Sequence, residues 1–159
     1  MREKRSIGID LQPWVDTRLL QFEAERPSRS GLEAHLASMY QNVRDFQPSV
    51  AIIDAVTNLL AVGSQTDVRA MLMRMIDHLK VSEITGLFSS LTSATSSFEE
   101  TEAGISSLMD TWIVMGIDEL EHERRRSLRI LKSRGMPHSN RVHEFALTNH
   151  GLRLTDGRG

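Results

Sequence analysis

The stretch Val50-Ala51-Ile52-Ile53-Asp54 decides the fold class, because it is a short apolar run that ends in a carboxylate. An uninterrupted apolar run of this length is typical of a strand buried in a parallel sheet. On both sides of it, apolar residues recur with the period of a helix, over residues 32–46 and 68–79. We therefore expect a buried strand between two amphipathic helices.

Local start and stop signals support both helices. Ser30 and Glu33 have the spacing of a capping box, so the first helix should begin there, and Pro48 should end it. The second helix should follow Ser64. The buried faces that we expect consist of Leu32, Leu36, Met39, Tyr40, Val43 and Phe46 in the first helix, and of Val68, Met71, Leu72, Met75, Ile76 and Leu79 in the second.

Further elements extend this pattern towards both ends of the chain. Thr85 to Leu91 reads as a second strand, and strands that alternate with helices predict a parallel sheet with right-handed crossovers. Near the amino end, Asp10 is expected to cap a short helix with Pro13 in its first turn and Trp14 on its buried side. Leu19 to Glu23 reads as a short strand.

The carboxyl-terminal part has a different character. Three β-like runs, Thr111 to Met115, Ser127 to Lys132 and Val142 to Leu147, follow one another without long helices between them. Charged and turn-forming segments at 118–126 and 135–140 separate these runs. We expect one strand of the main sheet that leads into antiparallel strands. The sequence thus predicts a single α/β domain over residues 1–154, with a flexible tail at 155–159.

Composition excludes several classes of function. The 159 residues carry a net charge of −2, which gives no reason to expect affinity for nucleic acid or membranes. The chain has no cysteine, so disulfides, thiolate zinc sites and cysteine nucleophiles are excluded. The six histidines lack the spacing of metal ligands. No signal segment or long apolar run is present, and the cytoplasm is the expected location.

Asp54 is the first candidate site residue. A carboxylate at the end of a buried parallel strand has the form of a Walker B motif, which reaches Mg²⁺ on a nucleotide. The same pattern is typical of an aspartate that caps a turn, so the run alone leaves both interpretations open. A phosphate-binding loop would need a Gly-Lys pair, and the lysines at positions 4, 80 and 132 follow Glu3, Leu79 and Leu131.

Two longer stretches resemble the KaiC family, whose best-known member is a cyanobacterial clock ATPase. They are Gly104-Ile105-Ser106-Ser107-Leu108-Met109-Asp110-Thr111-Trp112 and Ile130-Leu131-Lys132-Ser133-Arg134-Gly135-Met136-Pro137-His138-Ser139. The similarity runs from about Arg5 to Leu154 and matches the carboxyl-terminal portion of the family's second ATPase domain. It implies a partial RecA-like P-loop NTPase fold, mainly a parallel sheet with helices and carboxyl-terminal antiparallel strands.

The resemblance also implies roles for individual residues. Asp54 matches the Walker B aspartate that serves Mg²⁺. Ser106 and Ser107 match the hydroxyl pair that KaiC phosphorylates on itself, and Thr101 matches a further threonine nearby. KaiC proteins form hexameric rings with ATP between subunits. The residues that match contacts to the neighbouring subunit's nucleotide are Arg126, Lys132, Arg134 and His138.

Simpler interpretations stand beside these matches. The Ser/Thr-rich stretch over 89–107 has the composition of a solvated loop, and Glu123 to Arg126 has that of a solvated turn with locally paired charges. Nucleic-acid binding is a further alternative for the basic run, but it lacks interleaved aromatic residues.

The sequence departs from the family in one important respect. It begins downstream of the Walker A loop and of the catalytic glutamates, so we expect it not to bind or hydrolyse ATP alone. In a RecA-like sheet the missing strand lies between Thr85–Leu91 and Thr111–Met115, and its removal leaves two unpaired edges.

Two functions follow from the resemblance. The chain is either an interaction or ring-subunit module, in a homo-oligomer or docked on a complete KaiC-like ATPase, or part of a split ATPase and serine/threonine autokinase. In the second case another chain brings the P-loop and the glutamates. Circadian timing is an association of the family alone.

Overall fold

The computed structural model describes residues 8–26, 28, 30–91, 107–120 and 123–155. The chain separates into two compact units. One unit is Phe22–Leu108, and the other combines Met1–Gln21 with Met109–Gly159. A single domain over residues 1–154 stays a prediction.

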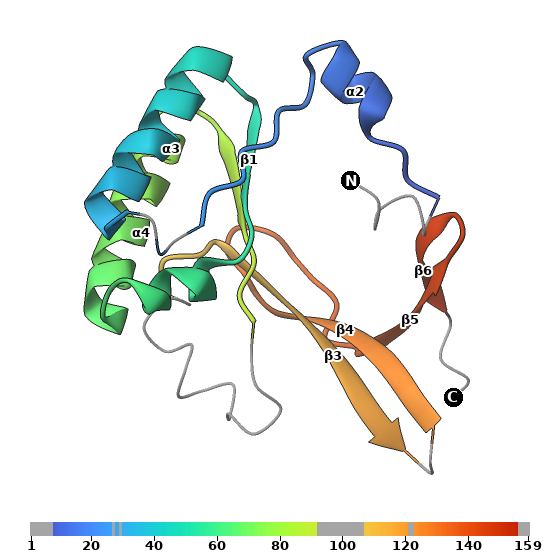
Figure 1. Ribbon diagram of the computed structural model, residues 1–159. Coiled ribbons are helices and arrows are strands. Elements are labelled where there is room, and N and C mark those ends of the chain that lie inside the picture. The colour runs from blue at the N-terminus through green and yellow to red at the C-terminus, as the bar shows by residue number, and fades with distance from the viewer. Residues whose placement is uncertain (1–7, 27, 29, 92–106, 121–122, 156–159) are drawn as a thin grey trace. The chain divides into compact units, whose positions relative to one another are not determined.

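The unit Phe22–Leu108 contains the α/β part of the chain. Strands β1 (Val50–Ile53) and β2 (Thr85–Phe88) pair in parallel. Helices α3 (Leu32–Phe46) and α4 (Gln65–Val81) lie on the same side of this pair, and the 3-10 helix η2 (Val56–Ala61) follows β1 (Figure 1). The two predicted long helices, the predicted strands after residues 49 and 84, and their parallel pairing are therefore confirmed, although β2 ends at Phe88 and not at Leu91.

The core of this unit is the apolar face of α4 packed against α3 and the strands. Met71 and Leu72 are each only 1% exposed, and every residue of the predicted face of α4 is buried. On α3, Leu36 and Val43 are buried, while Leu32, Met39 and Tyr40 pack against the cluster. The helical period of the apolar residues therefore predicted the core faces of both helices, except for Phe46, which is only partly buried and lies outside the cluster.

The β1 strand is buried on one face only. Ala51 and Ile53 pack against the core, whereas Ile52 is 67% exposed and Val50 is also exposed. Leu87, the partner of Ile52 on β2, is exposed as well. The prediction of a fully buried strand is wrong within this chain, because the helices cover only one side of the sheet.

The two helices begin in different ways. Ser64 and Asp67 form a capping box at α4, in which the Ser64 hydroxyl accepts from the Asp67 N–H at 3.2 Å. At α3 the predicted box is absent, because Gly31 occupies the N-cap position and Ser30 turns to other partners. Helix α3 ends at Phe46, as expected. Gln47 follows as a C-cap in the left-handed conformation, and Pro48 comes next.

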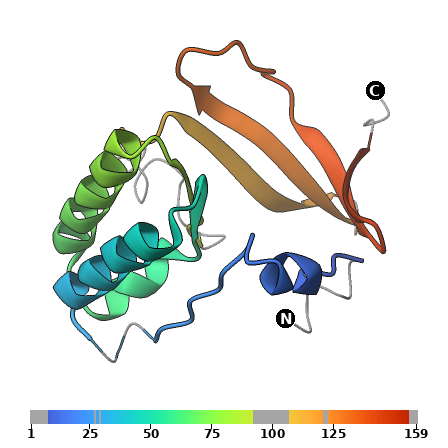
Figure 2. The same cartoon turned by 90° about the horizontal axis from the view of Figure 1, so that it is seen from above.

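The other unit is built around an antiparallel sheet. Strands β3 (Thr111–Leu120), β4 (Glu123–Ser133), β5 (His143–Thr148) and β6 (Gly151–Thr155) pair in that order, and Figure 2 shows β3 and β4 as its long hairpin. The antiparallel prediction is confirmed, but β6 was missed.

Three details of the predicted carboxyl-terminal part are wrong. Among the described residues β3 pairs only with β4, so it is not a strand of the parallel sheet. The charged segment 118–126 lies largely inside the β3–β4 hairpin. Thr155, assigned to the tail, pairs with Glu144 in the sheet, and residues 156–159 lie outside the described residues.

One face of the antiparallel sheet carries many apolar residues, and Arg124, Arg126 and His143 lie on it among them. Directly paired residues share a face, and side chains alternate along each strand. The register therefore places on one face Ile113, Met115, Ile117, Leu128, Ile130, Phe145, Leu147, Leu152 and Leu154. Phe145 is buried, but most of the others are substantially exposed. We call this set the apolar sheet face.

The amino-terminal segment departs most from prediction. Helix α2 (Gln12–Asp16) forms with Pro13 in its first turn, and the Gln12 N–H donates to the Asp10 carboxylate at 3.1 Å. Trp14 is 50% exposed, so its predicted burial is wrong. Residues 19–23 form no strand. Among the described residues, no helix has the length and apolar character needed to cross a membrane.

The core of α4 leads to a first prediction. Leu72→Ala should lower the free energy of unfolding by about 3 kcal/mol, because it removes a buried side chain and leaves a cavity. Met73→Ala is the matched control, since Met73 lies next to Leu72 but is 43% exposed; its effect should stay below about 1 kcal/mol. Urea unfolding followed by circular dichroism measures both, and equal losses would contradict this packing.

The capping box of α4 leads to a second prediction. Hydrogen bonds from the Ser64 hydroxyl and backbone N–H lower the pKa of Asp67 below its ordinary value. Because folding lowers this pKa, the resulting stabilisation is present above the ordinary pKa and is lost as the pH falls through the folded pKa. The difference in unfolding free energy between the native chain and Asp67→Ala should therefore shrink between about pH 6 and about pH 3. A difference that is constant over this range would contradict the box.

Candidate functional site

Asp54 lies directly after β1, at the carboxyl edge of the parallel pair. Ser89 follows β2 directly, and its hydroxyl donates a hydrogen bond to Asp54 Oδ1. The Ser89 N–H donates to the Ile53 carbonyl at 3.0 Å, and the Val56 N–H donates to the Ser89 carbonyl at 2.9 Å. The ends of both strands are thus fastened together around the carboxylate. Sequence reasoning missed Ser89, although its place at the end of the neighbouring parallel strand was a usable signal.

Asp54 could serve as one carboxylate ligand of a magnesium ion, but the residues around it do not form a complete metal site. Within the described part of the chain, no group of three or more His, Cys, Asp or Glu side chains is placed to hold a metal. Mg²⁺ is commonly held by one or two carboxylates together with nucleotide phosphates and water. Asp54 therefore fits such a shared arrangement, in which the nucleotide and water supply the remaining ligands.

An irregularity in the β3–β4 pairing determines the face of the sheet on which Lys132 lies. The register shifts between Trp112 and Ile113, so that Trp112 faces Lys132 while Ile113 faces Ile130. Leu131 is thereby left as the extra residue of a β-bulge. The pairing with Trp112 places Lys132 on the sheet face opposite Ile113 and Ile130. The bulge therefore moves the lysine off the apolar sheet face.

Arg134 lies just beyond the end of β4 and is held by the start of β3. Its N–H donates to the Asp110 carbonyl at 2.8 Å, and its Nη1 lies 4.0 Å from Asp110 Oδ1. The next residue, Gly135, has a φ of +74°, a left-handed conformation that glycine adopts without strain. Lys132 and Arg134 therefore occupy the same end of the β3–β4 hairpin.

The other two predicted cations are placed differently. Arg126 pairs with Ile117 on β3 and Phe145 on β5, which puts it on the apolar sheet face and six strand positions before Lys132. That separation corresponds to about 20 Å along a strand. His138 is exposed in the segment between β4 and β5. The structure thus brings together Lys132 and Arg134, and it places Arg126 apart from them.

The predicted hydroxyl pair is described only in part. Ser107 is exposed in a turn four residues before β3. Ser106 and Thr101 lie outside the described residues. Their roles as phosphoacceptors stay predictions.

Comparison with known proteins identifies the family. The model of the family described as "ATPase: KaiC" matches residues 1–158. The chain belongs to the KaiC family of ATPases. It is 44% identical over 157 residues to the circadian clock protein KaiC2 of Synechocystis sp., and 32% identical over 156 residues to the circadian clock oscillator protein KaiC of Parathermosynechococcus lividus. These alignments cover 98% of this chain but only 28% and 29% of the two relatives.

KaiC membership gives the geometry a chemical context. A family of ATPases uses nucleotide and Mg²⁺ in general, and an aspartate at the carboxyl edge of a parallel sheet is in the ordinary position for such ligands. The chain spans less than a third of the length of the curated KaiC relatives that it matches.

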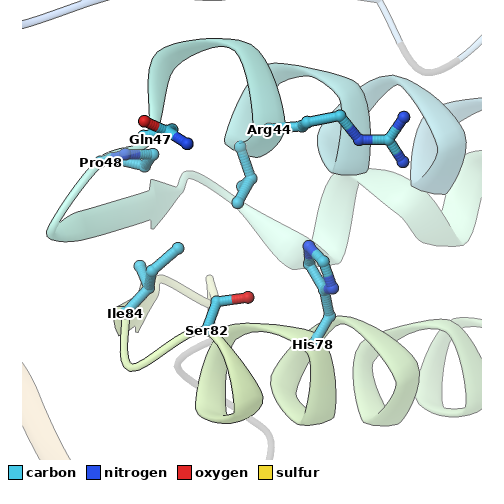
Figure 3. Close-up of a pocket in the computed structure, with 7 residues that line it drawn as sticks. Arg44, Gln47, Pro48, His78, Ser82 and Ile84 are labelled. Carbon is cyan, nitrogen blue, oxygen red and sulfur yellow. The ribbon is translucent and has the colours of Figure 1, made fainter.

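Two surface depressions formed by the described residues of the α/β unit lack the character of a phosphate site. One depression of about 330 Å³ lies at the carboxyl ends of α3 and α4, with Arg44, His78 and Ser82 on its wall (Figure 3). Helix carboxyl ends carry partial negative charge, which disfavours an anion. A second depression, of about 340 Å³, lies at the amino ends of α3 and α4 and is lined by Glu33, Asp67 and Arg74. The helix amino ends favour an anion, but Arg74 is already paired with Glu33 at 2.5 Å and the Asp67 carboxylate remains, which disfavours phosphate there.

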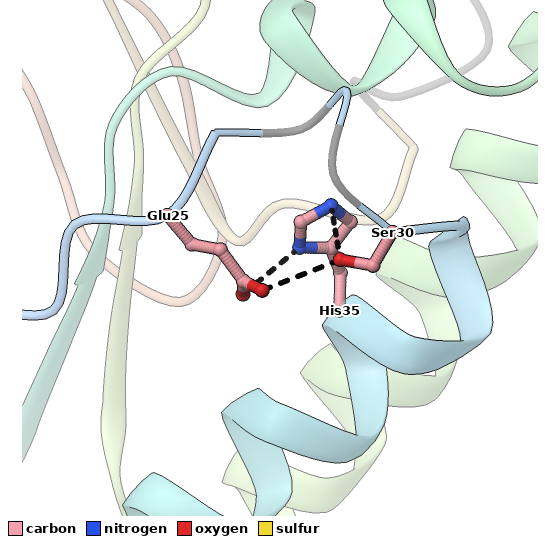
Figure 4. A network of polar contacts seen from close by, with 3 residues as sticks. All are labelled: Glu25, Ser30 and His35. Atoms are coloured by element: carbon pink, nitrogen blue, oxygen red, sulfur yellow. Dashed lines mark hydrogen bonds and ion pairs between the residues drawn. The ribbon is translucent and has the colours of Figure 1, made fainter.

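A buried histidine anchors the segment that leads into α3. His35 is 4% exposed, and its Nδ1 lies 3.2 Å from the Glu25 carboxylate (Figure 4). The Ser30 hydroxyl donates to the same carboxylate at 3.3 Å and lies 3.4 Å from His35 Nε2. The Ser–His–carboxylate set resembles a nucleophilic triad in composition. However, the Ser30 hydroxyl contacts the Glu25 carboxylate as well as the imidazole, and the three side chains tie the preceding segment to α3, so we interpret the arrangement as a structural clamp.

The clamp leads to a third prediction. His35→Ala should lower the free energy of unfolding by about 2 kcal/mol, because it removes a buried group and leaves Glu25 without its imidazole partner. His150→Ala is the control, since His150 is exposed in the turn between β5 and β6. Thermal unfolding of both variants tests the contrast, and a neutral His35→Ala would contradict the clamp.

Proposed function

We propose that this KaiC-family chain acts as a ring-subunit or interaction module that contributes Lys132 and Arg134 to a nucleotide held by a neighbouring subunit. The observation that supports this proposal most directly is the placement of both cations at one end of the β3–β4 hairpin, with Arg134 fastened to Asp110. A planar guanidinium suits phosphate oxygens, and an ammonium adds a point charge. An arginine supplied from another subunit stabilises charge on a phosphate during its transfer.

The partner in this proposal must supply the phosphate cradle. The 159 residues contain no Gly-Lys pair, and neither depression of the α/β unit has the character of a phosphate site. The nucleotide would bring the phosphates on which Lys132 and Arg134 act. We therefore propose that the chain does not bind or hydrolyse ATP by itself.

The apolar sheet face supports an assembled state. Its members Ile113, Met115, Ile117 and Leu154 are each more than half exposed. A contiguous apolar surface of this kind is typical of a protein–protein interface. The neighbour in our proposal is either another copy of this chain or a complete KaiC-like ATPase. Family membership favours the complete ATPase, because that protein has its own phosphate-binding loop.

A second candidate function is supported by the parallel strand pair. Parallel sheets are usually covered on both faces, yet Val50, Ile52 and Leu87 are exposed on the face opposite α3 and α4. A chain that carries the P-loop and the catalytic glutamates would cover this face and pair with a free strand edge. In this alternative the two chains form a split ATPase and autokinase, with Asp54 as a ligand of Mg²⁺ and with Ser106, Ser107 and Thr101 as acceptors.

The preferred function leads to a fourth prediction. The purified chain alone should give no heat with Mg-ATP in titration calorimetry, because it lacks the cradle. Mixed with the Synechocystis KaiC2 protein and Mg-ATP, it should co-sediment with that protein. Lys132→Ala and Arg134→Ala together should weaken this association at least about tenfold, the loss expected for two charged contacts to phosphate.

The matched control is Arg69→Ala, which removes an exposed cation from α4 in the other unit. It should leave the association unchanged. The preferred function would be contradicted if neither the double variant nor the omission of Mg-ATP weakened the association. ATP hydrolysis that appears only when a second chain carrying the P-loop and the catalytic glutamates is added would favour the split enzyme.

A further inference from the structure

Asp110, the residue immediately before β3, contacts both the backbone and the side chain of Arg134. The backbone is held by the Arg134 N–H, which donates to the Asp110 carbonyl at 2.8 Å. The guanidinium is held by the Asp110 carboxylate, with 4.0 Å between Nη1 and Oδ1. One strand position further on, Thr111 Oγ1 and Ser133 Oγ lie 3.3 Å apart, which fastens the residue before Arg134. We call these three contacts the Asp110 latch.

The latch lies at a corner of the chain, just beyond the end of β4. Gly135 turns the backbone immediately after Arg134, so β4 cannot continue to guide the side chain. The guanidinium of Arg134 and the carboxylate of Asp110 are 56% and 55% exposed. The ion pair is therefore open to solvent, and a ligand can reach the guanidinium without displacing buried groups.

We propose that Asp110 is a positioning residue that presents the Arg134 guanidinium to phosphate, an inference that rests on the proposed contact between Arg134 and a neighbour's nucleotide. An arginine side chain has many rotamers and loses this freedom on binding. A partner that restricts it beforehand reduces that loss. The guanidinium has five N–H donors, so it can contact more than one acceptor at a time.

The alternative is that the pair only stabilises the sheet. Ion pairs between exposed groups contribute little to stability. The backbone hydrogen bond of the latch uses the Asp110 carbonyl, which any residue at position 110 retains. Asp110→Asn therefore removes the charge and keeps the size and the backbone contact, and we expect the variant to fold like the native chain.

The first arm of the test measures the latch without nucleotide. In nuclear magnetic resonance relaxation of the ¹⁵N-labelled chain, the Arg134 Nε–H order parameter should fall in Asp110→Asn. The matched control is Asp77→Asn, which removes an exposed carboxylate from α4 and should leave Arg134 unchanged. Both variants should keep the native unfolding midpoint. An order parameter that is equal in the native chain and in Asp110→Asn would overturn the inference.

The second arm measures the consequence for function in the full assembly. In the Mg-ATP-dependent association with the Synechocystis KaiC2 protein, Asp110→Asn should weaken binding by about three- to tenfold. Combined with Arg134→Ala, it should add no further loss, because its effect passes through that arginine. A purely structural role would instead add its loss in either background, and this result would also overturn the inference.

The two arms separate the latch from the function on which it depends. If Arg134→Ala alone leaves the association unchanged, the proposed nucleotide contact fails. Our inference fails with it, even where the first arm shows that Asp110 orders the side chain. If Arg134→Ala weakens the association and Asp110→Asn does not, the contact stands and the positioning role of Asp110 is overturned.

Discussion

Burial of one face of α4 is the constraint on which the α/β unit depends. Met71, Leu72, Met75 and Leu79 fill the space between α3 and the parallel strands, and they are the most fully buried large side chains among the described residues. This packing holds α3 and α4 on a single face of β1 and β2. It fixes the ends of the two strands, and the hydrogen bonds of Ser89 then complete the placement of Asp54. The candidate magnesium ligand is thus positioned by apolar packing remote from it.

The antiparallel unit positions its functional side chains by strand register. A single extra residue at Leu131 changes the face on which Lys132 lies. Pairing at the start of β3 then brings Asp110 to Arg134. Arg126, on the same strand but before the bulge, remains on the apolar sheet face. The proposed contribution to a neighbour's nucleotide therefore centres on Lys132 and Arg134, with Arg126 at a separate place on the surface.

Each of the two units has an apolar face that is exposed among the described residues. The parallel pair has one apolar face without a covering layer, and the antiparallel sheet has another. Burial of apolar surface drives association, so such faces favour further subunits or chain segments. The two proposed functions differ in which surface the partner covers.

The sequence by itself determined the α/β class, both long helices, the core face of α4 and the position of Asp54 after a strand. These features depend on local periodicity and on short-range capping, which neighbouring residues encode. Only the tertiary structure decided that β1 is covered on one side, that Ser89 holds Asp54, and that the bulge redirects Lys132. It also decided that Asp110 meets Arg134, 24 positions further along the chain. Such contacts arise from strand pairing and register between distant segments, which no local pattern specifies.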